Sequence, residues 1–132
     1  MVGFVEEILR LRLSGGSDAP SRARRALRGL NGSLAGLEHR VPLLVSELIT
    51  NSVEHAGAGP EDSIELELTS SEEMVRVEVT DHGPWTEPPA ARSEPGGFGL
   101  LLVEQLADRW GVGPGPRKCV WFEIDRRPPV PA

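Results

Sequence analysis

The sequence predicts an α+β fold, a two-layer α/β sandwich in which about three helices cover one face of a mixed, mostly antiparallel sheet. Apolar and polar residues alternate in several short segments, while other segments repeat apolar residues at helical spacing. Their order is strand, helix, helix, hairpin, loop, helix, hairpin. The chain has 132 residues, 39% hydrophobic and 26% charged, which is typical of a globular protein with a real core. We therefore expect one domain over residues 1–125 and a flexible C-terminal tail over residues 126–132.

The chain begins with a strand and a helix. Leucines and arginines alternate over residues 9–13, which predicts a half-buried strand. The following glycines and serines end that strand, and Ser17 or Asp18 can cap a helix that has Pro20 in its first turn. The helical pattern continues to Leu30.

Four arginines lie largely on the outward side of this first helix, although the protein is acidic. A solvated helix face and a contact surface for a partner are both consistent with this pattern. These residues are Arg22, Arg24, Arg25 and Arg28.

The second helix carries a polar stripe beside its apolar face. The helix starts between Leu37 and Pro42 and runs to Ala56. Residues at i, i+4 and i+8 lie nearly above one another on a helix, so Glu47, Asn51 and His55 form this narrow stripe. A solvated face tolerates such residues in any order, whereas a stripe at the rim of a buried face is what a binding site needs.

The second half of the chain predicts two hairpins, a loop and a helix. Strict alternation over residues 63–69 and 74–80 indicates antiparallel strands joined by a short turn. The proline- and glycine-rich residues 81–97 form a long loop, and such loops are often functional. A helix follows over residues 99–108. Two strands, 109–112 and 118–125, then form the last hairpin.

Two further segments contain residues that packing does not require. Asp81 ends a strand, and Gly83 lets a flat ligand approach the backbone beside its carboxylate; an ordinary Asx turn is the alternative. The glycines before Leu100 leave free N–H groups at a helix start, where an anion is favoured. This is not a Walker motif, because no Gly-Lys-Ser/Thr follows. It is not a dinucleotide fingerprint either, because no strand immediately precedes it.

Composition excludes several functions. A net charge of −6 argues against sequence-independent binding of nucleic acid and against a polybasic membrane anchor. No apolar run reaches the roughly 20 residues that a membrane span needs. The single cysteine, Cys119, excludes an internal disulfide and a multi-cysteine metal site. We expect a cytoplasmic protein that contacts neither nucleic acid nor membrane.

Taken in order and spacing, these segments resemble the GHKL superfamily of histidine-kinase-like ATPases. Within it the chain looks like the bacterial anti-sigma-factor serine/threonine kinases and their small regulatory relatives. "ELITNSVEHA" resembles the N box of the superfamily, "VEVTDHGP" its first glycine box, "GGFGLLLVEQLADRWGV" its second and "KCVWFEI" the closing strand. The resemblance covers residues 21–125 and implies the Bergerat-type form of the predicted sandwich.

The resemblance implies a role for each polar residue of the first two boxes. Asn51 matches the asparagine that binds the Mg²⁺ bridging the triphosphate of ATP, and its neutral oxygen suits a cation that keeps most of its waters. Glu47 matches the acid that accepts a hydroxyl proton, and so would be catalytic. Asp81 matches the acceptor for the adenine amino group, and Gly83 lets the ring lie close.

The second glycine box matches less closely. Gly97, Phe98, Gly99 and Leu100 fall where the family wraps the phosphates. Relatives often have an arginine at the position of Phe98, where it would neutralise phosphate charge, so this phenylalanine argues against tight ATP binding or turnover. His55 falls where relatives carry a basic residue near the phosphates, or else caps the helix end.

The resemblance implies a function with one alternative. The first reading is an ATP- and Mg²⁺-dependent kinase that phosphorylates an anti-sigma-factor antagonist and sequesters a sigma factor; relatives are often homodimers. The alternative is a nucleotide-gated or vestigial protein-binding module without catalysis. Cys119 falls where relatives often have a threonine near the adenine, although its residue type favours a buried structural role.

Overall fold

The computed structural model describes residues 5–30, 32–54, 61–81, 100–113 and 118–126. These residues form five strands and three helices. In chain order the elements are β1 (Glu6–Ser14), α1 (Ala19–Arg28), α2 (Arg40–Glu54), β2 (Ser63–Ser70), β3 (Met74–Asp81), α3 (Leu100–Leu106), β4 (Arg109–Val112) and β5 (Lys118–Asp125).

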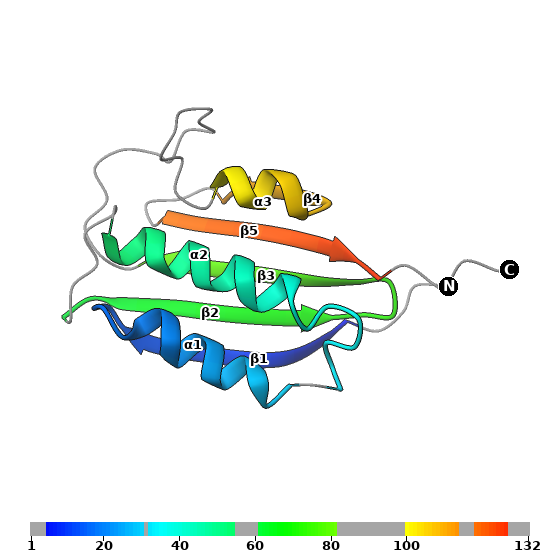
Figure 1. Ribbon diagram of the computed structural model, residues 1–132, viewed down its shortest axis with the longest axis horizontal. Helices are drawn as coiled ribbons and strands as arrows, with labels where there is room; N and C mark the ends of the chain where they lie inside the picture. The colour runs from blue at the N-terminus through cyan, green and yellow to red at the C-terminus, as the bar shows by residue number, and fades with distance from the viewer. Residues whose placement is uncertain (1–4, 31, 55–60, 82–99, 114–117, 127–132) are drawn as a thin grey trace, which may run out of the picture.

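The strands form one sheet in the order β1-β2-β3-β5-β4. All four neighbouring pairs are antiparallel, so the predicted fold class, including its mostly antiparallel sheet, is confirmed. Both predicted hairpins form. The second of them, β4 with β5, joins the sheet through β5, which therefore lies between β3 and β4 (Figure 1).

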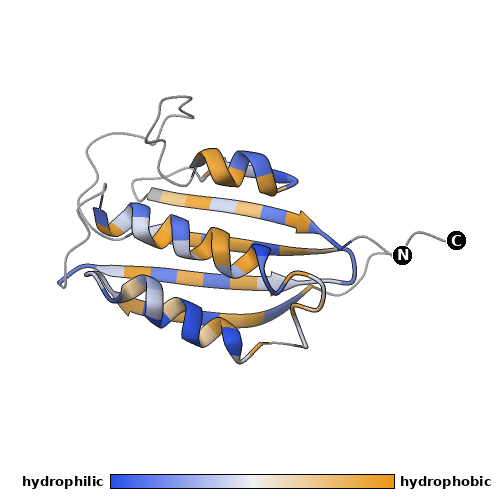
Figure 2. Ribbon diagram, in the orientation of Figure 1, coloured by the Kyte–Doolittle hydropathy of each residue, from blue (hydrophilic) through white to orange (hydrophobic). Residues whose placement is uncertain are grey.

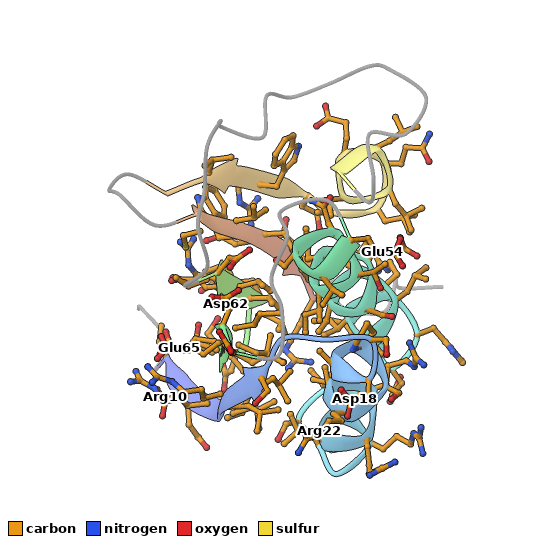
Figure 3. The ribbon with its side chains drawn as sticks, turned by 90° about the vertical axis from the view of Figure 1, so that its left-hand side faces the viewer. Arg10, Asp18, Arg22, Glu54, Asp62 and Glu65 are labelled. Carbon is orange, nitrogen blue, oxygen red and sulfur yellow. The ribbon has the colours of Figure 1, made fainter. Side chains whose placement is uncertain are left out.

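The helices cover one face of this sheet and leave the other face open, as the end-on view in Figure 3 shows. Apolar and polar residues alternate along the strands (Figure 2), and buried apolar residues from strands and helices form one core between the two layers. Strand β3 illustrates the principle, because every second residue of it, beginning with Val75, is buried. The largest fully buried side chains are Phe122, Leu27, Leu34, Leu44, Ile49, Ile64, Leu66, Leu68 and Ile124.

The helix ends differ slightly from the prediction. Helix α1 ends at Arg28 rather than Leu30, because the Gly29 amide already donates to the carbonyl of Ala26 in a tighter turn, 3.2 Å away. Asp18 occupies the N-cap position without a side-chain capping bond. Helix α2 begins at Arg40, inside the predicted window, with proline in its first turn, and its predicted last residues lie outside the described ranges.

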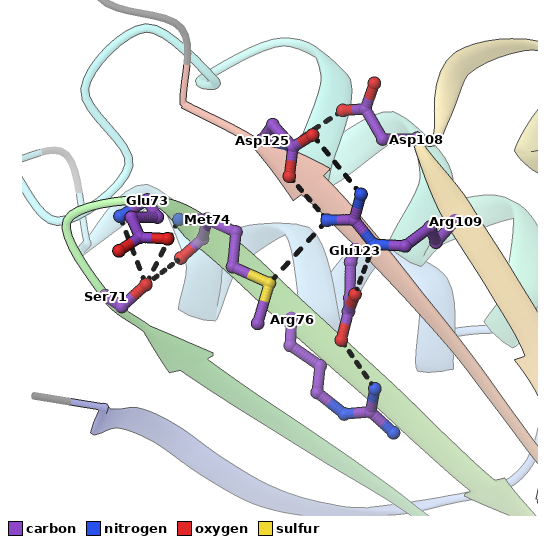
Figure 4. Close-up of polar contacts among 8 residues, drawn as sticks. All are labelled: Ser71, Glu73, Met74, Arg76, Asp108, Arg109, Glu123 and Asp125. Carbon is purple, nitrogen blue, oxygen red and sulfur yellow. Dashed lines mark hydrogen bonds and ion pairs between the residues drawn. The ribbon is translucent and has the colours of Figure 1, made fainter. Parts of the chain in front are cut away.

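The open face of the sheet carries a network of ion pairs (Figure 4). Arg109 donates to Glu123, 2.7 Å away, and also pairs with Asp125. Arg76 reaches the same Glu123 at 2.8 Å and lies over the Trp121 ring, 4.4 Å from its centroid. The charges of this region are therefore satisfied within the sheet.

In the part of the chain that the structure describes, every helix is too short or too polar to cross a membrane.

Candidate nucleotide-binding site

The topology brings the polar segments to one end of the sandwich. Strand β3 ends at Asp81, which pairs in register with Ile64 near the start of β2 and with Lys118 at the start of β5. Helix α2 also ends here, and α3 begins here, as Figure 1 shows toward its left side. Segments that are far apart in sequence thus meet where a helix layer and a sheet edge adjoin.

Asn51 is the most unusual residue at this end. Its side chain is only 4% exposed, and no other described residue forms a hydrogen bond with its carboxamide. A buried amide without a partner costs about 1–3 kcal/mol, so folded proteins rarely keep one without a reason. Within the part of the chain that the structure describes, nothing competes with a ligand for the carboxamide oxygen.

Asp81 lies on the same side of the sheet as the helices. Burial alternates along β3, and Asp81 continues the buried set that starts at Val75. Its carboxylate is 2% exposed and already has an interaction within the protein. An acceptor fixed at the end of a central strand suits recognition of a flat polar group, because the strand itself sets its position.

Glu47 lies one turn before Asn51 on α2 and is half-buried. No described residue forms a hydrogen bond or ion pair with its carboxylate. Glu47 and Asn51 lie on the same side of α2, one turn apart, and of the two only Asn51 is buried.

Ser52 is a buried polar residue that the sequence pattern had not singled out. It is 2% exposed and directly follows Asn51. The signal for it is the helical period, because position 52 continues the buried series of α2 that includes Val41, Val45 and Leu48. A hydroxyl within an apolar series is the same kind of anomaly as the carboxamide beside it.

Cys119 is not brought together with these residues. It pairs in register with Thr80 and lies on the open face of the sheet, with Sγ 4.0 Å from Glu78 Oε1. The sheet separates it from the helix layer and Asn51. The cysteine is also only partly buried, which differs from the buried structural role that its residue type favoured.

The other predicted site residues cannot be placed on this frame. His55, Gly83, Gly97, Phe98 and Gly99 lie outside the described residues. Leu100 is the first residue of α3, and its backbone lies at the end of the sandwich described above.

The residues present fit a hydrated cation better than a protein-only metal cage. Among the described residues, no three His, Cys, Asp or Glu side chains cluster as metal ligands. Mg²⁺ in nucleotide sites usually takes one or two protein oxygens and completes its shell with water and phosphate. One orphaned carboxamide oxygen in Asn51 is consistent with that ligand set.

Comparison with known proteins identifies the class. The family described as "Histidine kinase-like ATPase domain" matches residues 17–124, and the chain belongs to this family. The matched range contains Glu47, Asn51 and Asp81, and an ATPase domain implies ATP as the ligand of the fold.

Individual relatives support the same class. The chain is 32% identical over 117 residues to "Serine-protein kinase RsbW" of Listeria monocytogenes, covering 74% of each chain. The protein of the same name from Listeria innocua matches with the same identity and coverage. A Streptomyces coelicolor protein, "Uncharacterized protein SCO4941", is 34% identical over 91 residues, covering 65% of this chain and 86% of its own.

Proposed function

We propose that residues 1–125 form one ATP-binding domain that works as a serine/threonine protein kinase on an anti-sigma-factor antagonist and that also sequesters a sigma factor. Membership of the histidine-kinase-like ATPase family and the likeness to proteins named serine-protein kinase support this proposal. The partners themselves come from the resemblance of the sequence boxes to anti-sigma-factor kinases.

The observation that carries the proposal is the buried carboxamide of Asn51, which has no hydrogen-bond partner among the described residues. Packing alone gives no reason for it, because an apolar side chain at this position would avoid the cost of desolvating the amide. A ligand that binds the amide oxygen removes this cost. Mg²⁺ together with the phosphates of ATP is the ligand that the family implies for this position.

Three residues of the chain would have separate roles in binding and catalysis. Asn51 would hold the metal and Asp81 would accept a hydrogen bond from the adenine amino group, which orients the nucleotide across the end of the sheet. Bound Mg·ATP supplies the phosphoryl group and the charge neutralisation that most phosphoryl transfer depends on. Glu47, more exposed than Asn51, would accept the proton of a partner's serine or threonine hydroxyl.

A second function is favoured by one residue. Phe98 takes the place at which relatives often carry an arginine, so the chain lacks a positive charge there that would stabilise phosphate. A protein that binds nucleotide and a partner but transfers no phosphate fits this substitution. Glu47 favours the kinase, and Phe98 favours the binding module.

Calorimetry with Mg·ATP tests the nucleotide site. We expect micromolar binding to the wild type, and loss of binding in Asn51→Ala and in Asp81→Ala. Thr50→Ala is the matched control, because it changes the neighbouring, half-buried residue of the same helix. Circular dichroism of each variant checks that the fold is retained.

Transfer of labelled phosphate to a candidate antagonist then separates the two functions. The kinase predicts transfer by the wild type and none by Glu47→Gln, with Mg·ATP binding unchanged in that variant. Binding without transfer would leave the nucleotide-gated module. Absence of binding up to millimolar Mg·ATP would exclude both and leave a protein-interaction domain.

A further inference from the structure

A small groove lies between the C-terminal half of α1 and the start of α2. Its volume is about 210 Å³, below the roughly 300–1,000 Å³ usual for small-molecule sites. Its floor is apolar, because Leu27 and Leu34 are each only 2% exposed. The groove is lined by Arg24, Leu27, Arg28, Leu34, Glu38 and Pro42.

The two arginines that line the groove have no carboxylate partner among the described residues. Arg24 donates to the Ser46 hydroxyl, 2.7 Å away, and neither Arg24 nor Arg28 forms an ion pair with any described residue. Glu38 also lines the groove, and its carboxylate accepts a hydrogen bond from the Gly36 amide at 3.0 Å.

The arrangement on the open face of the sheet is the opposite. There Arg10 pairs with Glu67, Arg12 with Glu65, and the arginines of β3 and β4 pair with Glu123. The chain carries 20 acidic residues against 14 basic ones, so acids are not scarce. Arg24 and Arg28 therefore differ from the arginines of the open face in lying, without an ion pair among the described residues, beside an apolar floor.

We propose that this groove docks a segment of a partner protein that carries an acidic side chain next to an aliphatic one. The aliphatic side chain enters the apolar floor, which has room for one or two side chains. The carboxylate pairs with Arg28, whose planar guanidinium can bind it through two hydrogen bonds.

This inference goes beyond the proposed function, because the groove and the nucleotide site are separate. Pro42 lies in the first turn of α2, and Asn51 follows nine residues later. At 1.5 Å per residue the two positions are roughly 14 Å apart along the helix. A protein that fails to bind nucleotide can still use the groove, and the reverse also holds.

Selection from a random peptide library displayed on phage, with the immobilised full chain as target, tests the proposal. We expect enriched peptides to combine aspartate or glutamate with leucine, isoleucine or valine. A synthetic peptide of the enriched sequence is then titrated against Arg28→Glu and against the matched control Arg25→Glu. Both arginines are exposed on α1 and lack an ion pair among the described residues, but only Arg28 lines the groove.

The expected result is about a tenfold or larger loss of affinity for Arg28→Glu and a clearly smaller loss for Arg25→Glu. Asn51→Ala should bind the peptide normally, which keeps this test independent of the nucleotide site. Equal losses in the two arginine variants would indicate diffuse electrostatics and overturn the proposal. Failure to enrich acidic peptides would overturn it as well, as would binding of phosphatidylserine vesicles in place of any peptide.

Discussion

Replacing Asn51 by alanine should make the protein more stable while removing its ligand site. The carboxamide is buried in α2 and has no hydrogen-bond partner among the described residues. Most substitutions of buried residues destabilise a protein, so an increase in stability for Asn51→Ala would be a stringent test of this interpretation. It follows directly from the interpretation of Asn51 as a residue kept for binding.

Three terms set the size of the effect. Removing an unsatisfied buried amide gains about 1–3 kcal/mol. Alanine is a better helix former than asparagine by roughly 0.6 kcal/mol. The space left by the carboxamide costs about 1 kcal/mol. The balance favours Asn51→Ala by about 1.5 kcal/mol, which is about 5 °C in Tm for a chain of this length.

Urea and thermal unfolding without nucleotide measure this difference. Leu48→Ala is the control, because Leu48 is a buried apolar residue of the same helix and its truncation should cost about 2–5 kcal/mol. Added Mg·ATP should raise the Tm of the wild type and leave that of Asn51→Ala unchanged. An Asn51→Ala protein that is less stable than the wild type would refute the reasoning, because the carboxamide would then have a stabilising partner.

Three further predictions concern strands β4 and β5 and the residue that follows β5. Gly111→Ala should destabilise the protein by about 1–3 kcal/mol in thermal unfolding, because the new Cβ would lie 2.9 Å from Cζ2 of Trp121; an unchanged Tm and tryptophan emission would contradict this. Burial raises the pKa of Glu123, but hydrogen bonds from Arg109 and another arginine outweigh it, so this pKa lies below its usual 4.5. The charged form of Glu123 therefore stabilises the fold above that pH, and this contribution is lost as the pH falls through the lowered pKa. In Glu123→Gln the free energy of unfolding should fall less steeply with decreasing pH; an equally steep fall would contradict this. Arg126→Ala should lower the free energy of urea unfolding by about 1 kcal/mol, because its guanidinium donates to backbone carbonyls of the α1–α2 connection and the β2–β3 turn; no change would mean that water replaces these bonds fully.

Local patterns were sufficient to predict the elements of the fold. Alternation along β3 predicted correctly that Val75 and its alternate neighbours face the core, since successive side chains of a strand point to opposite faces. Helix starts were also predictable, because proline is tolerated only in a first turn, as Pro42 illustrates. The end of α1 was less predictable, because Gly29 permits a turn that the apolar pattern does not require.

The candidate site was predictable in its residues but not in its environment. The spacing of Glu47 and Asn51 on one helix follows from 3.6 residues per turn, and the position of Asp81 follows from the end of a strand. The sequence cannot state which of these side chains finds a partner, because partners come from other elements. Tertiary structure decided that the Asn51 carboxamide is buried and that no described residue forms a hydrogen bond with it.

The sequence by itself determined the kinds of elements, their order and the polar residues within them, because these depend on interactions a few residues apart. Tertiary structure decided how the elements combine. It placed β5 between β3 and β4, which aligned Asp81 with the start of β5. It also put Cys119 on the open face and placed Arg28, which has no ion pair among the described residues, beside an apolar groove. The physical reason is that strand register and helix packing bring together residues whose separation in sequence carries no local signal.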